Sequence, residues 1–434
     1  MSVLAIFLGI LLAMMGLFLA FRSYRHKRIV DDTPTSKTQG VFIGLVELKG
    51  TAESETPFTS YLDNRRCVCY SYQVQEQWSR LVTESYTDSK GQTHTRTRRE
   101  TGWKTVGSGG ESAPFYLRDD TGVIRIVPDG ASLKETAFFN KTCSRGEPLY
   151  FAKGPATEIA NSDHRRRFTE TGIPLHAHLY IIGQARERQD AVAAEIAQDK
   201  AAPMFVISVK SERQISRGYL AGFWVWLFVG LLFACGGAYG WQLSNTNNIT
   251  TWQPYVIAIG TYLAAFGIGW LWTVYNSLIN LKYRVVQAWS QVDVQLKRRN
   301  DLIPNLAETV RGYGPHESET QKMIAELRNQ VSATPPGAPG PDFKSFAPEL
   351  KVIMENYPEL KANELFLGLQ KSLVETEQRI ALARDYFNSS ATYYNTRLEI
   401  IPDRFVAAMA RMKPRSLMSA ADFERAPVRV NLAD

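Results

Sequence analysis

Cysteine is scarce in this sequence, and its scarcity excludes one class of protein. The chain has 434 residues and 4 cysteines, Cys67, Cys69, Cys143 and Cys235. A small secreted domain held together by disulfides carries a denser and more regular cysteine set. Reduced thiols in a cytosolic compartment are therefore the simpler interpretation.

Charge is absent from a long part of the chain. Residues 218–281 contain no Asp, Glu, Lys or Arg, and within them lie two apolar runs, 219–239 and 255–274. Residues 3–21 form a third run without charge. A helix needs roughly 20 apolar residues to cross the hydrocarbon core of a bilayer. The sequence therefore predicts a first transmembrane helix in residues 1–21 and a transmembrane hairpin in residues 218–274.

Lys and Arg gather on one side of each expected span. They follow the first span, precede the second and follow the third, whereas the Met1 end and residues 240–254 contain none. Because such residues favour the cytoplasmic flank, we expect the N-terminus outside and residues 22–217 and 275–434 in the cytoplasm. A cleaved signal peptide is the alternative for the first span, but it needs its basic residues before the apolar run. A retained signal anchor is favoured.

Residues 40–217, after a basic juxtamembrane linker at 22–39, have a β-rich pattern of short alternating segments between turn residues. Residues 118–122 predict a tight hairpin turn whose glycine supplies a positive φ. The insert at 83–102 is rich in Ser, Thr and Arg and predicts an exposed loop or a long hairpin tip. The charged, Ala-rich stretch at 184–201 predicts a short surface helix or a disordered excursion.

Two pairs of possible zinc ligands occur in this region. Cys67 and Cys69, and also His176 and His178, have the alternate spacing that puts both members of a pair on one face of a strand. Nothing in the sequence shows that the two strands meet, and buried thiols with ordinary histidines are the commoner explanation. We expect no metal site and no cofactor.

Residues 275–434 have a helical pattern. The absence of proline before Pro304 predicts that the third span continues from the membrane as one helix, which Pro304 then bends. A second helix is expected at 316–332, before a Pro-rich linker at 334–348, and a third helix from near Asn363. The third helix repeats apolar or small residues in steps of three and four, as in the seam of a bundle. These residues are Phe366, Leu369, Leu373, Thr376, Ile380, Ala383, Phe387, Ala391, Tyr394, Leu398 and Ile401.

No candidate catalytic group stands out in this helical region. It contains no cysteine, and the seam contains no histidine, so a nucleophile with an adjacent base is missing. Its charges are interpreted as pairs at helix edges, and its asparagines as groups that fix register. The charges are Arg298, Arg299, Asp301, Glu377 and Arg384, and the asparagines are Asn363, Asn388 and Asn395. The chain is predicted not to be an enzyme.

The β-rich region resembles the GIDE domain. The resemblance rests on Gly50-Thr-Ala, Cys67-Val-Cys-Tyr-Ser-Tyr-Gln-Val-Gln-Glu, Trp103 and Pro114-Phe-Tyr-Leu-Arg-Asp-Asp-Thr-Gly-Val, within residues 40–240. GIDE domains are small β domains that lie beside the membrane in mitochondrial RING-type ubiquitin ligases and their bacterial relatives. In the ligases the activity resides in a RING with two zinc sites of about four Cys or His ligands each, which four scattered cysteines cannot build.

The helical region resembles the LemA family. The resemblance rests on Ala288-Trp-Ser-Gln-Val-Asp-Val-Gln-Leu-Lys-Arg-Arg-Asn-Asp-Leu-Ile-Pro-Asn-Leu, Glu355-Asn-Tyr-Pro-Glu-Leu-Lys-Ala-Asn, residues 377–386 and Tyr394-Asn395. It implies an antiparallel helical bundle attached to a bacterial membrane. The matching signature residues are interpreted as structural. They are Trp289, Arg298, Arg299, Asp301, Pro304, Asn305, Tyr357, Pro358, Asn363, Arg384 and Asn395.

The expected fold is thus a membrane α+β protein with three transmembrane helices, a small β-rich GIDE-like domain and an antiparallel LemA-like helical bundle. The leading hypothesis is a scaffold of the bacterial inner membrane that self-associates through the bundle. Its expected partners are membrane lipid, further copies of the chain and other membrane proteins, but not nucleic acid. The alternatives are a sensor or adaptor in envelope stress that binds a peptide or lipid through the GIDE-like domain, and a cryptic zinc-dependent enzyme.

Overall fold

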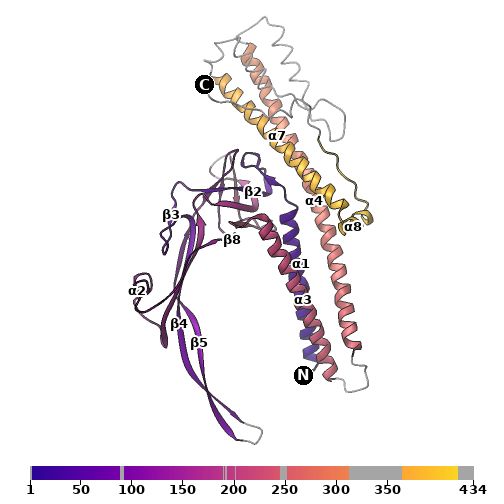
Figure 1. The fold of residues 1–434 in the computed structure, drawn as a ribbon. Helices are drawn as coiled ribbons and strands as arrows, with labels where there is room; N and C mark the ends of the chain where they lie inside the picture. The colour runs from indigo at the N-terminus through magenta and orange to yellow at the C-terminus, as the bar shows by residue number, and fades with distance from the viewer. Residues whose placement is uncertain are drawn as a thin grey trace. The chain divides into compact units, whose positions relative to one another are not determined.

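The chain forms two units in a computed structural model. The helical unit comprises Met1–Ser36 and Glu212–Asp434, and the β unit comprises Lys37–Ser211 (Figure 1). The structure describes residues 2–87, 92–188, 190, 193–200, 202–244, 252–311 and 364–418.

Three helices of the helical unit are long and apolar enough to cross a membrane. They are α1 (Ser2–Asp31), α3 (Glu212–Ser244) and α4 (Gln253–Arg311). Helix α1 is longer than the expected span, because residues 22–31, expected as a linker, continue it. These ten residues contain neither proline nor glycine, and an ion pair between Lys27 and Asp31, one turn apart, supports the last turn.

Glycines bring α1 and α3 into close antiparallel contact. A Cβ atom built on Gly16 would lie 2.6 Å from the Cα of Gly230, and one built on Gly9 would lie 2.6 Å from the Cα of Gly237. Small residues of this kind let the backbones of membrane helices approach closely. Helix α4 joins the pair through Tyr262, whose hydroxyl donates a hydrogen bond of 2.7 Å to the carbonyl of Leu227.

Helix α4 continues without a break from its apolar part to Arg311, which confirms one continuous helix. Pro304 lies inside α4 and does not end it. The expected helix at 316–332 and the Pro-rich linker at 334–348 lie outside the described residues.

Helices α7 (Glu364–Glu399) and α8 (Asp403–Met409) complete the described part of the helical unit. Helix α7 runs antiparallel to α4, because Leu398 packs near Val274 whereas Glu377 pairs with Arg299. The expected seam is present on α7 from Leu373 to Tyr394, where most of the expected residues are buried. The prediction fails at Ile401, which is 67% exposed because α7 has already ended. The facing residues on α4 are Val274, Leu278, Leu281, Val285, Ala288, Val292, Leu296 and Arg299.

The β unit contains a closed barrel. Strands pair in the order β2, β6, β7, β12, β11, and β11 pairs back with β2, so the ring has no open edge among these five strands. Strands β1, β13 and β8 extend the same sheet. The bounds are β1 Thr35–Ser36, β2 Gly44–Glu53, β6 Phe115–Arg118, β7 Val123–Ile126, β8 Ser132–Lys134, β11 His178–Glu187, β12 Ala194–Ala197 and β13 Val206–Ser208.

A second sheet has the order β3, β4, β10, β9, with β5 paired to β4. Its bounds are β3 Phe58–Thr59, β4 Arg66–Thr87, β5 Thr93–Ser112, β9 Thr136–Ser144 and β10 Ser162–Pro174, and the short helix α2 covers Leu149–Ala152. Strands β4 and β5 form a long hairpin whose end contains most of residues 83–102, so the expected hairpin tip is confirmed (Figure 1).

Two local predictions in the β unit are wrong. The stretch at 184–201 contains strand β12 rather than a helix, because Ala185 pairs with Ile196 inside the barrel, where both are buried. The turn at 118–122 does not use a positive φ at Gly122. Instead the Asp119 carboxylate accepts hydrogen bonds from the backbone N–H groups of Thr121 and Gly122, at 2.8 and 3.0 Å.

The glycine contact between α1 and α3 leads to a first prediction. We expect Gly16→Ala to lower the thermal unfolding temperature of the detergent-purified protein, because its methyl group would meet backbone atoms that cannot rotate away. Overpacking of this kind costs about 1–3 kcal/mol. The control is Gly236→Ala on α3, where a Cβ atom would meet nothing within 4 Å. Equal stability of the two variants would contradict the close packing.

Candidate functional site

The C-terminal end of α1 and the residue that follows it carry two buried charges, Arg28 and Asp32, which are 3% and 4% exposed. Arg28 donates a bidentate pair of hydrogen bonds to Asp403, from Nη2 at 2.6 Å and from Nη1 at 3.1 Å. Asp403 begins α8 and is itself 2% exposed. A bidentate arginine–carboxylate pair has the geometry that best offsets the cost of removing both charges from water.

The middle of helix α4 contacts the Arg28–Asp403 pair. The Arg28 Nε donates to the Ser277 hydroxyl at 2.9 Å, and that hydroxyl lies 3.3 Å from the Asp32 carboxylate. Further along α4, Arg284 donates to the Asp32 carbonyl at 3.0 Å. The end of α1 is therefore fixed to the stretch of α4 that follows its apolar part.

Helices α7 and α3 complete the set. Arg397, in the last turn of α7, donates to the Asp32 carboxylate at 2.7 Å and lies 3.7 Å from Asp403. On α3, the Ser216 hydroxyl donates to Asp31 at 2.6 Å. We call this group the Arg28 network. It consists of Arg28, Asp31, Asp32, Ser216, Ser277, Arg284, Arg397 and Asp403.

The Arg28 network balances three arginines against three aspartates, and it joins five helices. An apolar cluster of Val274, Leu278, Val406 and Ala407 lies beside it. No cysteine or histidine belongs to it, and its serine hydroxyls are bonded to aspartates that also pair with arginines or a lysine. Its ion pairs and hydrogen bonds connect the membrane-capable helices to the α7–α8 part.

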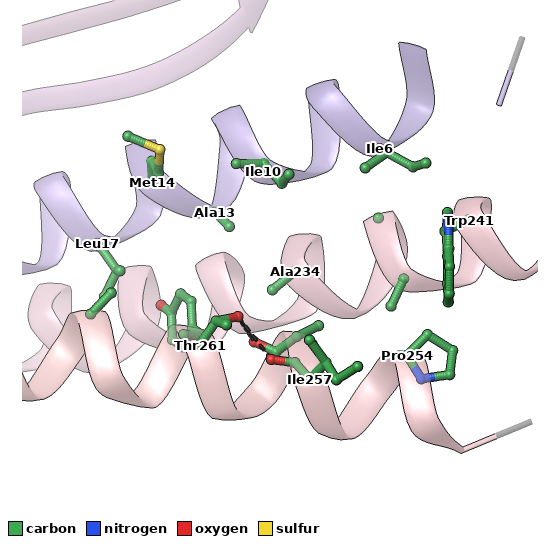
Figure 2. Close-up of a pocket in the computed structure, with 15 residues that line it drawn as sticks. Ile6, Ile10, Ala13, Met14, Leu17, Ala234, Trp241, Pro254, Ile257 and Thr261 are labelled. Atoms are coloured by element: carbon green, nitrogen blue, oxygen red, sulfur yellow. Dashed lines mark hydrogen bonds between the residues drawn. The ribbon is translucent and has the colours of Figure 1, made fainter. Parts of the chain in front are cut away.

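An apolar groove of about 520 Å³ lies between α1, α3 and α4, toward the N-terminal end of α1 (Figure 2). Figure 2 shows Ala13 and Leu17 of α1 pointing toward the other two helices, where α4 contributes Ile257 and Thr261. The Thr261 hydroxyl is bonded to a carbonyl of its own helix, that of Ile257 at 2.8 Å. The groove surface is consequently almost wholly hydrocarbon.

The β unit has a buried polar centre of its own around Arg166 and Glu76, neither of which is exposed. Arg166 donates to Glu76 from Nε and Nη2, at 3.1 and 3.0 Å. Its other N–H groups donate to the carbonyls of Tyr150, Pro155 and Thr157, at 2.8 to 3.0 Å. All five donors of the guanidinium are used, so this group holds the α2 loop onto the sheet rather than awaiting a ligand.

The four candidate zinc ligands lie on different elements of the β unit. Cys67 and Cys69 lie on β4 in the second sheet, whereas His178 lies on β11 in the barrel and His176 pairs with Glu53 at 2.8 Å. In the described part of the chain, no three His, Cys, Asp or Glu residues are grouped so that they could hold a metal ion.

Comparison with known proteins gives two family matches. A model described as the LemA family matches residues 288–432, and a model described as GIDE, E3 ubiquitin ligase, matches residues 83–239. The chain joins a GIDE-like domain to a LemA family segment. The LemA match falls on the α4–α7 part of the helical unit, and the GIDE match runs from the β4–β5 hairpin through α3.

Individual relatives are distant. Protein LemA of Metamycoplasma hominis is 25% identical over 158 residues, which are 35% of this chain and 72% of that protein. Magnetosome protein MamQ of Magnetospirillum gryphiswaldense is 22% identical over 169 residues, 32% of this chain and 62% of that protein. A uridylate kinase of Deinococcus radiodurans is 24% identical over 136 residues, 31% of this chain and 48% of that protein.

The signature residues of the LemA segment do not gather at one point. Trp289 packs edge-on against Phe387, with ring centroids 5.5 Å apart, and the fully buried Arg299 lies 3.4 Å from Glu377. Arg384 is buried, Asn395 is half-buried, and Arg298, Asp301 and Asn305 are exposed. The side chain of Pro304 and the residues Tyr357, Pro358 and Asn363 lie outside the described part of the chain.

The Arg28 network was not among the sites predicted from the sequence. One signal for it was available: Arg28 and Asp32 are one helical turn apart directly after an apolar span, and such charges are costly unless they are paired. Their partner Asp403 lies 375 residues away from Arg28, and no local pattern connects the two.

The Arg28 network predicts a large and local effect of one substitution. Arg28→Met removes the partner of the buried Asp403 and should destabilise the protein by about 3–5 kcal/mol. The control is Arg25→Met, one turn earlier on an exposed position, for which we expect less than about 0.5 kcal/mol. Thermal unfolding in detergent measures both. Similar melting temperatures for the two variants would show that the network contributes nothing.

The thiols on β4 predict slow alkylation. Burial raises the pKa of Cys67 to about 11, and burial together with nearby Glu135 raises that of Cys69 to about 12. At pH 8 roughly one Cys67 in a thousand is then thiolate, against roughly a quarter of an ordinary cysteine. We expect maleimide to label both residues slowly in the native protein and rapidly in SDS, by mass spectrometry. Rapid native labelling would contradict the raised pKa.

Proposed function

We propose that this protein is a scaffold of the bacterial inner membrane that anchors a LemA-like helical bundle and associates with copies of itself. One observation carries the proposal: the Arg28 network ties the membrane-capable helices to α7 and α8 with buried charges and no catalytic group. Such a connection fixes α7 and α8 relative to the membrane-capable helices, as a scaffold requires. LemA and MamQ proteins among the relatives are consistent with this function.

The orientation of the helices supports a specific topology. Helix α3 is antiparallel to α1, and α4 follows α3, so the N-terminus of α1 and the α3–α4 connection lie at the same end of the three helices. Basic residues gather at the other end, among them Arg25, Arg217 and Lys282. The N-terminus would then be outside, and both the GIDE-like domain and the LemA segment would be cytoplasmic.

Lipid is the expected partner of the apolar groove. Its lining is hydrocarbon, and the hydroxyls of Thr261 and Tyr262 are both bonded to helix carbonyls. A surface without free polar groups suits an acyl chain better than a polar metabolite. This assignment fits a groove formed by three membrane-capable helices.

Self-association is supported by exposed apolar side chains beyond the apolar part of α4. Tyr283, Val286 and Val294 are 68%, 48% and 56% exposed, and they lie on the side of α4 away from the seam with α7. Their spacing of three and eight residues places them in one stripe of the helix. A stripe of this kind offers a lateral contact for a second copy.

Catalytic activities of the relatives are not part of the proposal. The chain has 4 cysteines, fewer than the ligands of the two zinc sites that a RING requires. The match to uridylate kinase spans less than half of that protein.

The scaffold function predicts an oligomer. We expect light scattering after detergent extraction and gel filtration to give a mass several times that of the 48.9 kDa chain, corrected for bound detergent. Replacing Tyr283, Val286 and Val294 together by serine should shift the mass toward one chain. Replacing the exposed Leu81 and Val123 of the β unit serves as the control. A monomer at all concentrations would overturn self-association.

A further inference from the structure

Two asparagines on α7 bind the backbone of the segment that follows α8. Asn395 donates to the carbonyl of Arg415 at 2.7 Å and accepts from its N–H at 2.8 Å. Asn388 makes the same pair of bonds with Met418, at 3.1 and 2.8 Å. Each carboxamide therefore satisfies both backbone groups of one residue. We call residues 412–418 the C-terminal segment.

The spacing of the two contacts is that of a helix and an extended chain side by side. Seven residues of helix rise about 10.5 Å. Three residues of extended chain span about 10 Å. The higher-numbered Asn395 meets the lower-numbered Arg415, so the C-terminal segment runs antiparallel to α7. The match in length lets both asparagines engage one extended chain without bending it.

This site recognises backbone rather than side chains. The side chains of Lys413, Pro414, Arg415, Ser416 and Leu417 are exposed, and only that of Met418 is buried. A ligand must be extended, must have a backbone N–H at the two contact positions, and must offer an apolar side chain at the second. The site therefore fits an extended peptide, and the chain's own segment satisfies each requirement.

The connection between α8 and the C-terminal segment holds an unfavourable backbone conformation. Arg411 has a φ of +50°, and the N–H groups of Met412 and Arg411 bond to the carbonyls of Ala407 and Ala408, at 3.0 and 3.1 Å. This is the helix-ending motif in which glycine is usual at the position of Arg411. A side chain at this φ is strained, and the strain is released when the two bonds that end α8 open.

We propose that the site formed by Asn388 and Asn395 binds the C-terminal segment of a second copy of the chain, so that neighbouring copies exchange this segment. The contacts are the same within one copy and between two, and a short strained hinge favours exchange. The inference rests on the proposed self-association and adds a second contact between copies to that of the exposed stripe on α4.

Disulfide trapping between two full-length chains tests the exchange. One chain carries Thr392→Cys, at an exposed position of α7 one turn from each asparagine, and a differently tagged chain carries Ser416→Cys. After co-expression and mild oxidation, we expect a covalent dimer that contains both tags. The position control replaces Thr392→Cys by Tyr393→Cys, which is also exposed but lies about 100° further around the helix. Unsubstituted chains report on the four native thiols.

Two further arms establish what the trapped dimer depends on. Asn388→Ala with Asn395→Ala should lower its yield at least tenfold. A synthetic peptide with the sequence of residues 411–418 should also lower it, whereas the same peptide N-methylated at the two contact positions should not. The peptide arm uses unaltered asparagines, so it decides the question even if the double substitution impairs folding.

The outcomes separate this inference from the scaffold function. If light scattering shows oligomers but no mixed dimer forms, the exchange is wrong and self-association stands. If the chain is monomeric and no mixed dimer forms, both are wrong. A mixed dimer that is unaffected by the asparagine substitutions and by the peptide reflects random collision and also overturns the exchange.

Discussion

The pairing of Arg28 with Asp403 is the constraint on which the helical unit depends. A guanidinium that is 3% exposed is tolerable only if its donors are bonded, so the end of α1 has to meet the start of α8. Arg397 and Ser277 hydrogen-bond the Asp32 carboxylate, which is buried as well and therefore needs partners. The position of the α7–α8 part is thereby specified by polar groups, which tolerate no sliding of one helix along another.

Different interactions hold the helices of the helical unit together at its two ends. Toward the N-terminus of α1, Gly9 and Gly16 let the backbones of α1 and α3 approach closely, as small residues do between apolar helices. At the other end, beyond the apolar part of α4, buried ion pairs with good geometry hold α1, α7 and α8 together. Helix α4 spans both ends without a break, so each end constrains the other.

Local patterns predicted what local physics determines. The apolar runs gave the three membrane-capable helices, and steps of three and four gave the seam of α7, since both are properties of neighbouring residues. Ala185 was misjudged because pairing with Ile196 in the barrel overrides the helix preference of alanine. Gly122 was misjudged because the Asp119 carboxylate closes the turn instead. None of the signature residues belongs to the Arg28 network, and its central pair, Arg28 and Asp403, was not predicted because 375 residues separate the two.

The contacts of the Arg28 network are separate from those of the proposed segment exchange. Asp403 fixes the start of α8, and α8 ends at Met409, so the hinge at Arg411 has a set position. The C-terminal segment begins beyond that hinge and contributes nothing to the Arg28 network. In the proposed exchange, moving it to a second copy would break none of the buried ion pairs of the Arg28 network, and the neighbour would restore the two pairs of backbone bonds to Asn388 and Asn395. In the proposed exchange, a copy would pass its segment to a neighbour while the Arg28 network of its own helices stays intact.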